Sequence, residues 1–100
     1  DSLAGLARTY RSFAHEHPEG FRLIQTRTAS AEDLARASEP VLAAARDAVG
    51  DADALEAARF MTAWLTGFIT MELAGAFRLG GDLDRAFDYG IERVASALAG

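Results

Sequence analysis

The chain has no cysteine, no lysine and only two prolines among its 100 residues. Without cysteine, disulfide bonds and thiolate metal sites are excluded. β-Branched residues are few and scattered, so β-strands have little support. Alanine supplies many of the apolar residues, and alanine favours helices. The composition therefore predicts an all-α fold.

Positive charge and long apolar runs are scarce as well. Asp and Glu total 15 against ten Arg, which gives a net charge of -5. Duplex DNA binding needs several cations on the phosphates, so this chain is not expected to bind nucleic acid alone. The longest run without Asp, Glu or Arg covers residues 60–71, short of the roughly 20 residues that span a bilayer. With no secretory signal in view, we expect one cytoplasmic domain over residues 1–100 that does not enter membranes.

Apolar residues at helical spacing divide this domain into about five helices. We expect these helices over residues 3–16, 18–26, 31–49, 53–78 and 82–98. Ser30 and Asp33 form a capping box at the start of the third helix, and Asp82 is a cap for the fifth. Pro40 should kink or break the third helix, because proline removes one helical hydrogen bond. Gly80-Gly81 should end the fourth helix near residue 78.

The fourth helix contains the stretch MTAWLTGFITMELAGAF, residues 61–77, which is apolar on almost every side. A helix of this kind is normally buried all round. Four other helices of this length can hardly surround it, so a second copy of the chain is the expected cover. The alternative is a central core helix of a monomer. Small residues that would allow close helix contact form one strip: Ala63, Gly67, Thr70 and Ala74.

The fifth helix carries an apolar seam that could extend the same interface. The residues assigned to it are Phe87, Gly90, Ile91, Val94 and Leu98. The last two helices of each subunit would then form a four-helix interface about a two-fold axis.

No catalytic or metal site is expected. The serines lack the sequence around a nucleophile elbow, and no glycine-rich phosphate loop is present. His15 and His17 are a weak metal pair, because no third histidine or cysteine accompanies them. Glu72, on the most apolar helix, needs a partner, and an interfacial ion pair with Arg78, Arg85 or Arg93 is the expected one.

Three ordered segments resemble the C-terminal domain of TetR-family bacterial transcriptional regulators. YRSFAHEHPEGFRLI (10–24) is similar to a Tyr-Arg-x-Phe-Ala … His-Pro signature early in that domain. TGFITMELAGAF (66–77) resembles the His-Gly … Leu-Glu-x-x-Gly-x-Phe helix of the subgroup named after a Trp-His-Gly motif, with Thr66 in place of the histidine. DLDRAFDYGIERVASAL (82–98) is similar to the final helix. The family's N-terminal helix-turn-helix pattern is absent from this sequence, so DNA contact is expected only through a domain outside it.

The resemblance implies a homodimeric regulatory domain that binds a small apolar or amphipathic effector and thereby controls a linked DNA-binding domain. Such proteins form the dimer with their last two long helices and hold the ligand among the middle helices. No cofactor is implied. The candidate pocket residues are Tyr10, Phe13, Phe21, Phe60, Trp64, Thr66 and Phe68. The open alternatives are that these residues are plain core, and that the chain is a ligand-free dimerisation module with a filled interior.

Overall fold

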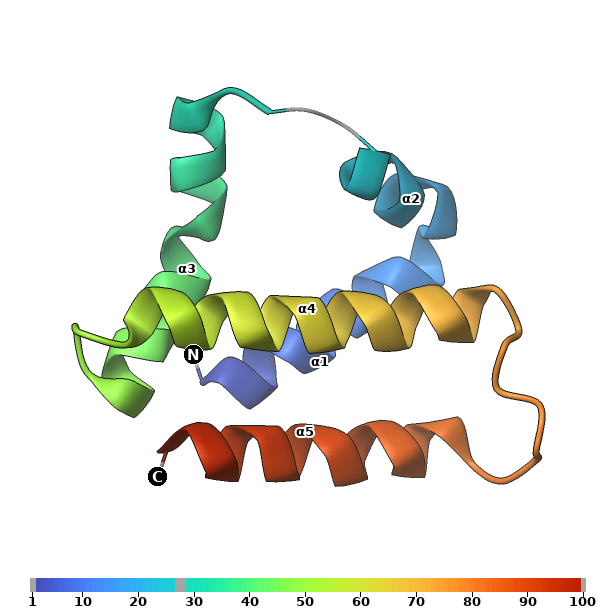
Figure 1. The fold of residues 1–100 in the computed structure, drawn as a ribbon. Coiled ribbons are helices and arrows are strands. Elements are labelled where there is room, and N and C mark those ends of the chain that lie inside the picture. Colours follow the sequence, from blue (N-terminus) through green and yellow to red (C-terminus); the bar gives the residue numbers. More distant parts are fainter. Residues whose placement is uncertain (1, 27–28, 100) are drawn as a thin grey trace.

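Five α-helices make up the fold in a computed structural model that describes residues 2–26 and 29–99 (Figure 1). They are α1 (Leu3–Glu16), α2 (Pro18–Thr26), α3 (Ala31–Val49), α4 (Ala54–Leu73) and α5 (Leu83–Ala99). The all-α prediction is confirmed, and the predicted limits of the first three helices match the observed ones.

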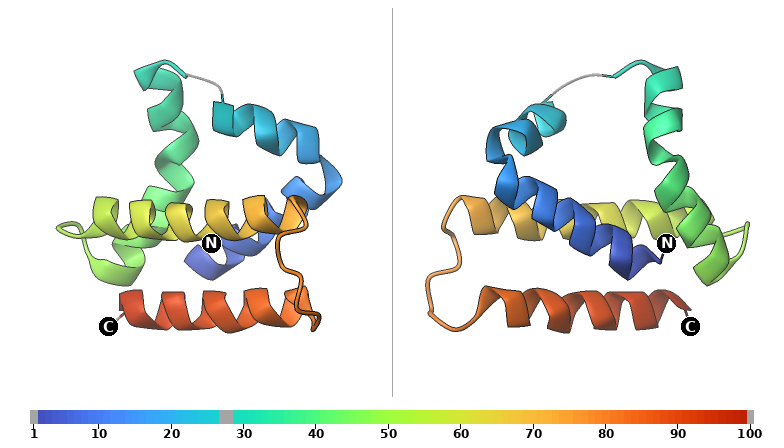
Figure 2. Two further views of the ribbon diagram at one scale, coloured as in Figure 1. Left: turned by 45° about the vertical axis from the view of Figure 1, so that its right-hand side comes forward. Right: turned by 180° about the vertical axis from the view of Figure 1, so that it is seen from behind.

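Helix α4 lies at the centre and packs against α1, α3 and α5 (Figures 1 and 2). Helix α5 runs alongside α4, while α2 and the first half of α3 stand on the opposite side of α4. The second half of α3 passes α4 and also contacts α5. The domain measures 40 × 33 × 18 Å. Because packed helices lie 8–10 Å apart, a thickness of 18 Å admits only about two helix layers. A single chain therefore cannot enclose α4.

Local side-chain caps fix where the helices begin. Ser2 Oγ accepts a hydrogen bond from the backbone N–H of Gly5 at 2.9 Å, and Ser30 Oγ accepts one from Asp33 at 3.1 Å. Asp82 Oδ1 accepts from the N–H of Asp84 at 2.9 Å. These bonds satisfy amide groups that have no partner inside the helix. The predicted caps Ser30 and Asp82 are confirmed, but the Asp33 carboxylate accepts from Arg36 Nη1 at 3.1 Å, so only the Ser30 half of the predicted capping box is found among the described residues.

Helix α4 ends at Leu73 and not near residue 78, so its predicted end is wrong. Gly75 has φ 69°, a left-handed conformation that glycine adopts easily. Its N–H donates to the carbonyl of Glu72 at 3.1 Å, and the N–H of Ala76 donates to Met71 at 2.9 Å. This pair of bonds is a Schellman motif, which closes the helix one turn before Gly80-Gly81.

Pro40 lies inside α3, which continues through it as one helix. The ribbon of α3 changes direction about halfway along its length (Figures 1 and 2). A proline has no N–H to donate to the carbonyl four residues earlier, and bending is the usual consequence. Of the two outcomes predicted from the sequence, a kink or a break, the structure therefore shows the kink.

The core is built around α4 from small side chains and a few large ones. Seven alanines are buried: Ala7, Ala14, Ala44, Ala45, Ala54, Ala57 and Ala58. The largest side chains that are fully buried are Phe21, Ile69, Phe87 and Ile91. Alanine lets helices approach closely but fills little volume, so the core has room for cavities where no large side chain is present.

Candidate functional site

A cavity of about 360 Å³ lies among α1, α2, α3 and α4. Its lining is mainly apolar and includes Leu6 of α1, Val41 of α3 and Leu65 of α4. Ligand pockets in proteins are usually concave, mostly apolar and a few hundred Å³ in volume. The cavity therefore has the size and the surface of a small-molecule site.

Two of the predicted pocket residues, Tyr10 and Thr66, line this cavity. Phe13 and Phe21 do not line it, although both pack close to it. The Phe13 ring stacks on Tyr10 at 6.2 Å between centroids, and the Phe21 ring lies 5.6 Å from Tyr10 in a tilted arrangement. The two phenylalanines hold the tyrosine ring in place and do not present a surface to a ligand.

The remaining aromatic candidates lie on other faces of α4. Trp64 and Phe68 pack on Phe87 of α5, with centroid distances of 5.4 and 5.3 Å. Phe60 is 52% exposed on the outer face of the helix. At about 100° per residue, Trp64 lies roughly 160° around α4 from Thr66. A helix that carries Thr66 into the cavity must therefore direct Trp64 away from it.

Sequence reasoning missed several residues that line the cavity. They are Leu3, Leu6, Ala7, Ile24, Gln25, Ala37, Ser38, Pro40, Val41, Met61, Thr62 and Leu65. Two signals pointed to this site: Thr62 and Thr66 repeat one turn apart on an otherwise apolar helix, and Pro40 interrupts the hydrogen bonds of α3. The contribution of Ile24 and Gln25 had no signal, because it depends on how α2 folds back over α1.

Tyr10 brings a polar group to the rim of the cavity. Its hydroxyl oxygen accepts a hydrogen bond from Gln25 Nε2 at 3.0 Å, so its own proton remains available to another acceptor. Burial raises the pKa of the Tyr10 phenol, against the smaller opposing effect of the Gln25 hydrogen bond. The phenol is therefore neutral at physiological pH.

A larger groove of about 620 Å³ adjoins the cavity between α3 and α4. Ser38, Val41, Thr62 and Thr66 line both hollows, so these side chains form a shared wall. The groove also exposes apolar side chains: Leu34 is 59% exposed and Leu55 is 45% exposed. Leu34 is exposed because the first half of α3 stands clear of the core.

The outer face of α4 is uncovered in the single chain. The small residues of the predicted interface, Ala63, Gly67, Thr70 and Ala74, are all exposed. Phe60 and Met71 flank them, and Met71 is 46% exposed. A Cβ atom added to Gly67 would meet no atom within 4 Å. Nothing within the chain therefore requires a glycine at this position.

The seam predicted on α5 packs inside its own chain. Phe87 is 1% exposed and Ile91 is 0% exposed, so neither has surface left for a partner. A Cβ atom at Gly90 would clash with the indole of Trp64. Val94 and Leu98 are partly buried against the same core. The seam attaches α5 to α4 and α1, because a helix with one strong apolar stripe buries that stripe in the nearest core first.

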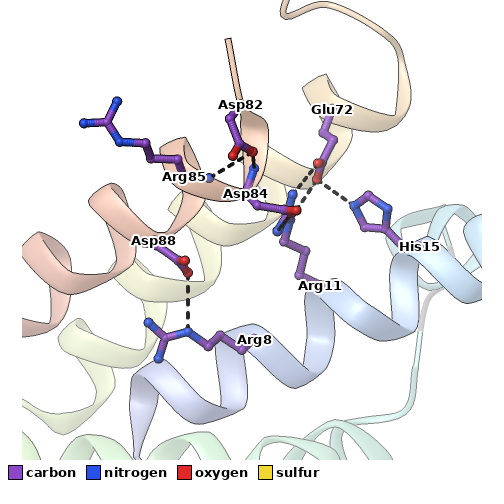
Figure 3. A network of polar contacts seen from close by, with 8 residues as sticks. All are labelled: Arg8, Arg11, His15, Glu72, Asp82, Asp84, Arg85 and Asp88. Atoms are coloured by element: carbon purple, nitrogen blue, oxygen red, sulfur yellow. Dashed lines mark hydrogen bonds and ion pairs between the residues drawn. The ribbon is translucent and has the colours of Figure 1, made fainter.

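Charged side chains join α1 to α4 and α5 (Figure 3). Arg11 donates from Nε to Glu72 Oε1 at 3.0 Å and from Nη2 to Glu72 Oε2 at 2.6 Å. Its Nη1 lies 2.8 Å from Asp84 Oδ1, and His15 Nε2 lies 2.9 Å from Glu72 Oε1. The side chains of Arg11 and Glu72 are only 13% and 6% exposed. The partners expected for Glu72 (Arg78, Arg85 and Arg93) are therefore wrong.

The network also shifts the pKa values of Glu72 and Arg11. Burial raises the pKa of Glu72, but hydrogen bonds from Arg11 and His15 outweigh it, so the net pKa is below its usual value. The hydrogen bond with Glu72 raises the pKa of Arg11. The Arg11 guanidinium also lies 4.7 Å from the centre of the Phe87 ring, in a cation–π contact. The pair is ionised and fixes the end of α4 to α1.

Neither metal binding nor membrane crossing finds support in residues 2–26 and 29–99. No cluster of three or more His, Asp or Glu side chains that could hold a metal occurs among them. His15 is already engaged with Glu72, and His17 is exposed at the end of α1. No helix in this part of the chain combines the length and hydropathy needed to cross a bilayer.

Comparison with known families agrees with the helical architecture. Residues 3–94 match the family described as tetracyclin repressor-like, C-terminal domain. No curated protein and no solved structure gives a significant match. The family consists of regulatory domains and not of enzymes. Since the match covers nearly the whole sequence, the chain belongs to the family of TetR-like C-terminal regulatory domains.

Proposed function

We propose that this domain senses a small apolar or amphipathic effector and controls DNA binding by a linked helix-turn-helix domain in a homodimeric bacterial repressor of the cytoplasm. The observation that carries the proposal is the 360 Å³ cavity, which four of the five helices line. A ligand in that cavity contacts α1, α2, α3 and α4 together. It can therefore favour one arrangement of these helices over another.

The effector acts through its difference in affinity between two arrangements of the helices. Helix α1 lines the cavity with Leu3, Leu6 and Tyr10, and through Arg11 it is tied to α4 and α5. A shift of α1 on ligand binding would move the domain that precedes it relative to the dimer. The spacing of the two DNA-reading domains would then change.

Filling the cavity tests the sensing proposal. Thr66→Phe places a ring at the wall shared by the cavity and the groove, so it should abolish ligand binding. A thermal-shift screen of hydrophobic compounds on the 100-residue chain should find compounds that raise the melting temperature of the wild type and not of Thr66→Phe. A ligand at 100 times its dissociation constant adds about 2.7 kcal/mol. Equal shifts in the two proteins would place binding outside this cavity.

The uncovered face of α4 supports the dimer in this proposal. Glycine within a helix costs roughly 1 kcal/mol relative to alanine, and Gly67 has no neighbour in its own chain that excludes a side chain. Close packing of a second helix on this face would explain why glycine occupies position 67. On α5, the small residues Ala86 and Ala97 are exposed, and they mark one flank of the helix because eleven residues make about three turns. We place the interface on α4 and on this flank, in place of the buried seam.

Substituting Gly67 tests the dimer. Gly67→Leu should separate the subunits, because a large side chain would hold the two helices apart. The fold of each chain should persist, since a side chain at this position meets open space. Light scattering at micromolar concentration measures the mass, and circular dichroism measures the helix content. Thr9→Leu, on the exposed face of α1, is the matched control. A wild-type chain that is monomeric would refute the dimer.

The alternative function is a dimerisation module without a ligand. In such a module the large apolar side chains of α4, which are Trp64, Phe68 and Met71, would fill the interior. Trp64 and Phe68 pack instead between α4 and α5, and Met71 is 46% exposed. Since none of the three lies in the lining of the cavity, the sensing function is the better supported of the two.

We also infer a relationship to the Trp-His-Gly subgroup of these regulators. The support is the positions that fit its helix motif, which are Gly67, Glu72, Leu73 and Phe77. Glu72 is the fixed point of the ion-pair network, which gives this motif position a structural role in the present chain.

A further inference from the structure

The lining of the cavity has no charged side chain among the described residues. Its one titratable group is the Tyr10 phenol, whose pKa burial raises, so the phenol stays neutral. Transfer of an ion from water into such a place costs several kcal/mol unless an opposite charge meets it. A charged ligand group would find no such partner inside the cavity.

Hydroxyl groups are concentrated at one part of this lining. Thr62 and Thr66 lie one turn apart on α4, and Ser38 faces them from α3. All three line both the cavity and the adjoining groove. Among the described residues, the Thr26 hydroxyl is the one that donates to a carbonyl of its own helix. The hydroxyls of Thr62 and Thr66 make no such bond, so they remain available to a ligand. A hydroxyl can donate and accept, so it can satisfy many neutral polar groups.

Apolar surface continues from the hydroxyls in two directions. On the cavity side it includes Leu6 and Leu65, and on the groove side it includes Leu42 and Ala58. A ligand with its polar group at the shared wall would have apolar surroundings on both sides. The wall is the only part of this lining where α3 and α4 both present hydroxyls among the residues that the structure describes.

From this arrangement we propose that the site selects an uncharged amphipathic ligand, with a hydroxyl, carbonyl or amide group against Thr62 and Thr66 and its apolar part in the cavity. The proposal rests on the proposed function, since it assumes that the cavity holds an effector. It adds that neutrality and one hydrogen-bonding group are what the site recognises.

Arg59 suggests an alternative mode of binding, for a ligand that carries a negative charge. It lines the outer groove but not the cavity, and it is exposed to solvent. A carboxylate ligand could lie in the groove with its charge at Arg59. Its binding would then depend on Arg59 and not on the two threonines, which makes the two readings separable by mutation.

A matched series of eight-carbon compounds tests the proposal: octan-1-ol, octanamide, octanoate and octylammonium. Binding to the 100-residue chain is measured at neutral pH by thermal shift and by titration calorimetry. The alcohol and the amide should raise the melting temperature. The two ions should not raise it at the same concentration, because the cavity lining offers no opposite charge to either of them.

The variant Thr62→Val/Thr66→Val removes both hydroxyls while keeping side-chain shape. It should weaken octan-1-ol binding about fivefold to tenfold, the effect of losing roughly one hydrogen bond. Thr9→Val, the same change on the exposed face of α1, should leave binding unchanged. The melting temperature of each variant without ligand confirms that it is folded.

Each result bears on one of the two proposals. Octanoate or octylammonium binding as tightly as octan-1-ol would overturn the neutral-ligand proposal, and loss of octanoate binding in Arg59→Gln would assign it to the groove. Unchanged octan-1-ol binding by the double valine variant would also overturn it. If none of the four compounds binds while the chain is folded, the neutral-ligand proposal fails. The proposed function fails with it only if the thermal-shift screen of hydrophobic compounds also finds no ligand for the wild type.

Discussion

The two sides of α4 are filled in different ways. Toward α5, Trp64 and Phe68 pack on Phe87 at centroid distances of 5.4 and 5.3 Å. Toward α2 and α3, Thr62 and Thr66 face a cavity of about 360 Å³. One helix thus carries a packed side and a hollow side. The difference teaches that large aromatic residues on a helix do not mark a pocket, because here they fill the opposite side.

Charge is divided between the two sides in the same way. The packed side carries the paired side chains Arg11, Glu72 and Asp84, while the cavity lining is uncharged. The packed side can supply stability that the hollow side lacks, since a cavity forfeits the contacts that would fill it. If this division holds, changes on the packed side should be costly to the fold, and changes on the hollow side should alter binding.

The largest effect is expected for Arg11→Ala on the packed side. It leaves Glu72, 6% exposed, without its main partner, and removing one member of a buried pair costs about 3–5 kcal/mol. Arg8→Ala is the matched control on the same helix. The Arg8 pair with Asp88 spans 3.6 Å and both side chains are about half exposed, so this change should cost about 0–1 kcal/mol. Urea unfolding measures both. Similar losses would show that the network contributes no more than a surface pair.

A smaller effect is expected for Gly90→Ala. A Cβ atom at this position clashes with the ring of Trp64, so α4 and α5 must shift, at a cost of about 1–3 kcal/mol. Gly20→Ala in α2 is the control, because its nearest neighbour would be Phe13 at 3.4 Å, an ordinary contact. That change should stabilise the chain by up to about 1 kcal/mol through helix propensity. Thermal melts of both variants check the sign. Stabilisation by Gly90→Ala would mean that α4 and α5 are loosely packed.

The sequence predicted the helices well because their limits are set by local groups. Ser30 and Asp82 bond amides within three residues, and Pro18 begins α2. The end of α4 was predicted one turn late, because Gly75 and the pair Gly80-Gly81 are equally good stop signals in sequence. Gly75 precedes the others and closes the helix first.

The site was predicted less well, because it depends on how the helices are rotated against each other. Periodicity shows that α4 is apolar all round, so it cannot tell which face meets α5. That Trp64 lies against Gly90 of α5 is decided by the fit between a large ring and a glycine 26 residues away. Of the predicted pocket residues, Tyr10 and Thr66 line the cavity, whereas Trp64 and Phe68 pack on the other side of α4. The partner of Glu72 likewise came from α1, 61 residues away.

The smallest expected effect is on stability in acid. It tests how much the charge of Glu72, on the packed side, contributes to the free energy of unfolding. The folded-state pKa of Glu72 lies below its ordinary value of 4.5, so the folded chain holds fewer protons at this site than the unfolded chain. Stability from this carboxylate is therefore fully present above pH 4.5 and is lost as the pH falls through the lower folded-state pKa.

The melting temperature of the wild type should thus decline as the pH falls below about 4.5. Glu72→Gln removes the titrating group, so it should melt lower at neutral pH and show a shallower acid decline. Glu92→Gln, exposed on α5, should follow the wild-type curve. Parallel declines in the wild type and Glu72→Gln would mean that other carboxylates govern acid stability. The contrast between the two sides of α4 would then rest on packing alone, because the buried charge would contribute nothing that pH can remove.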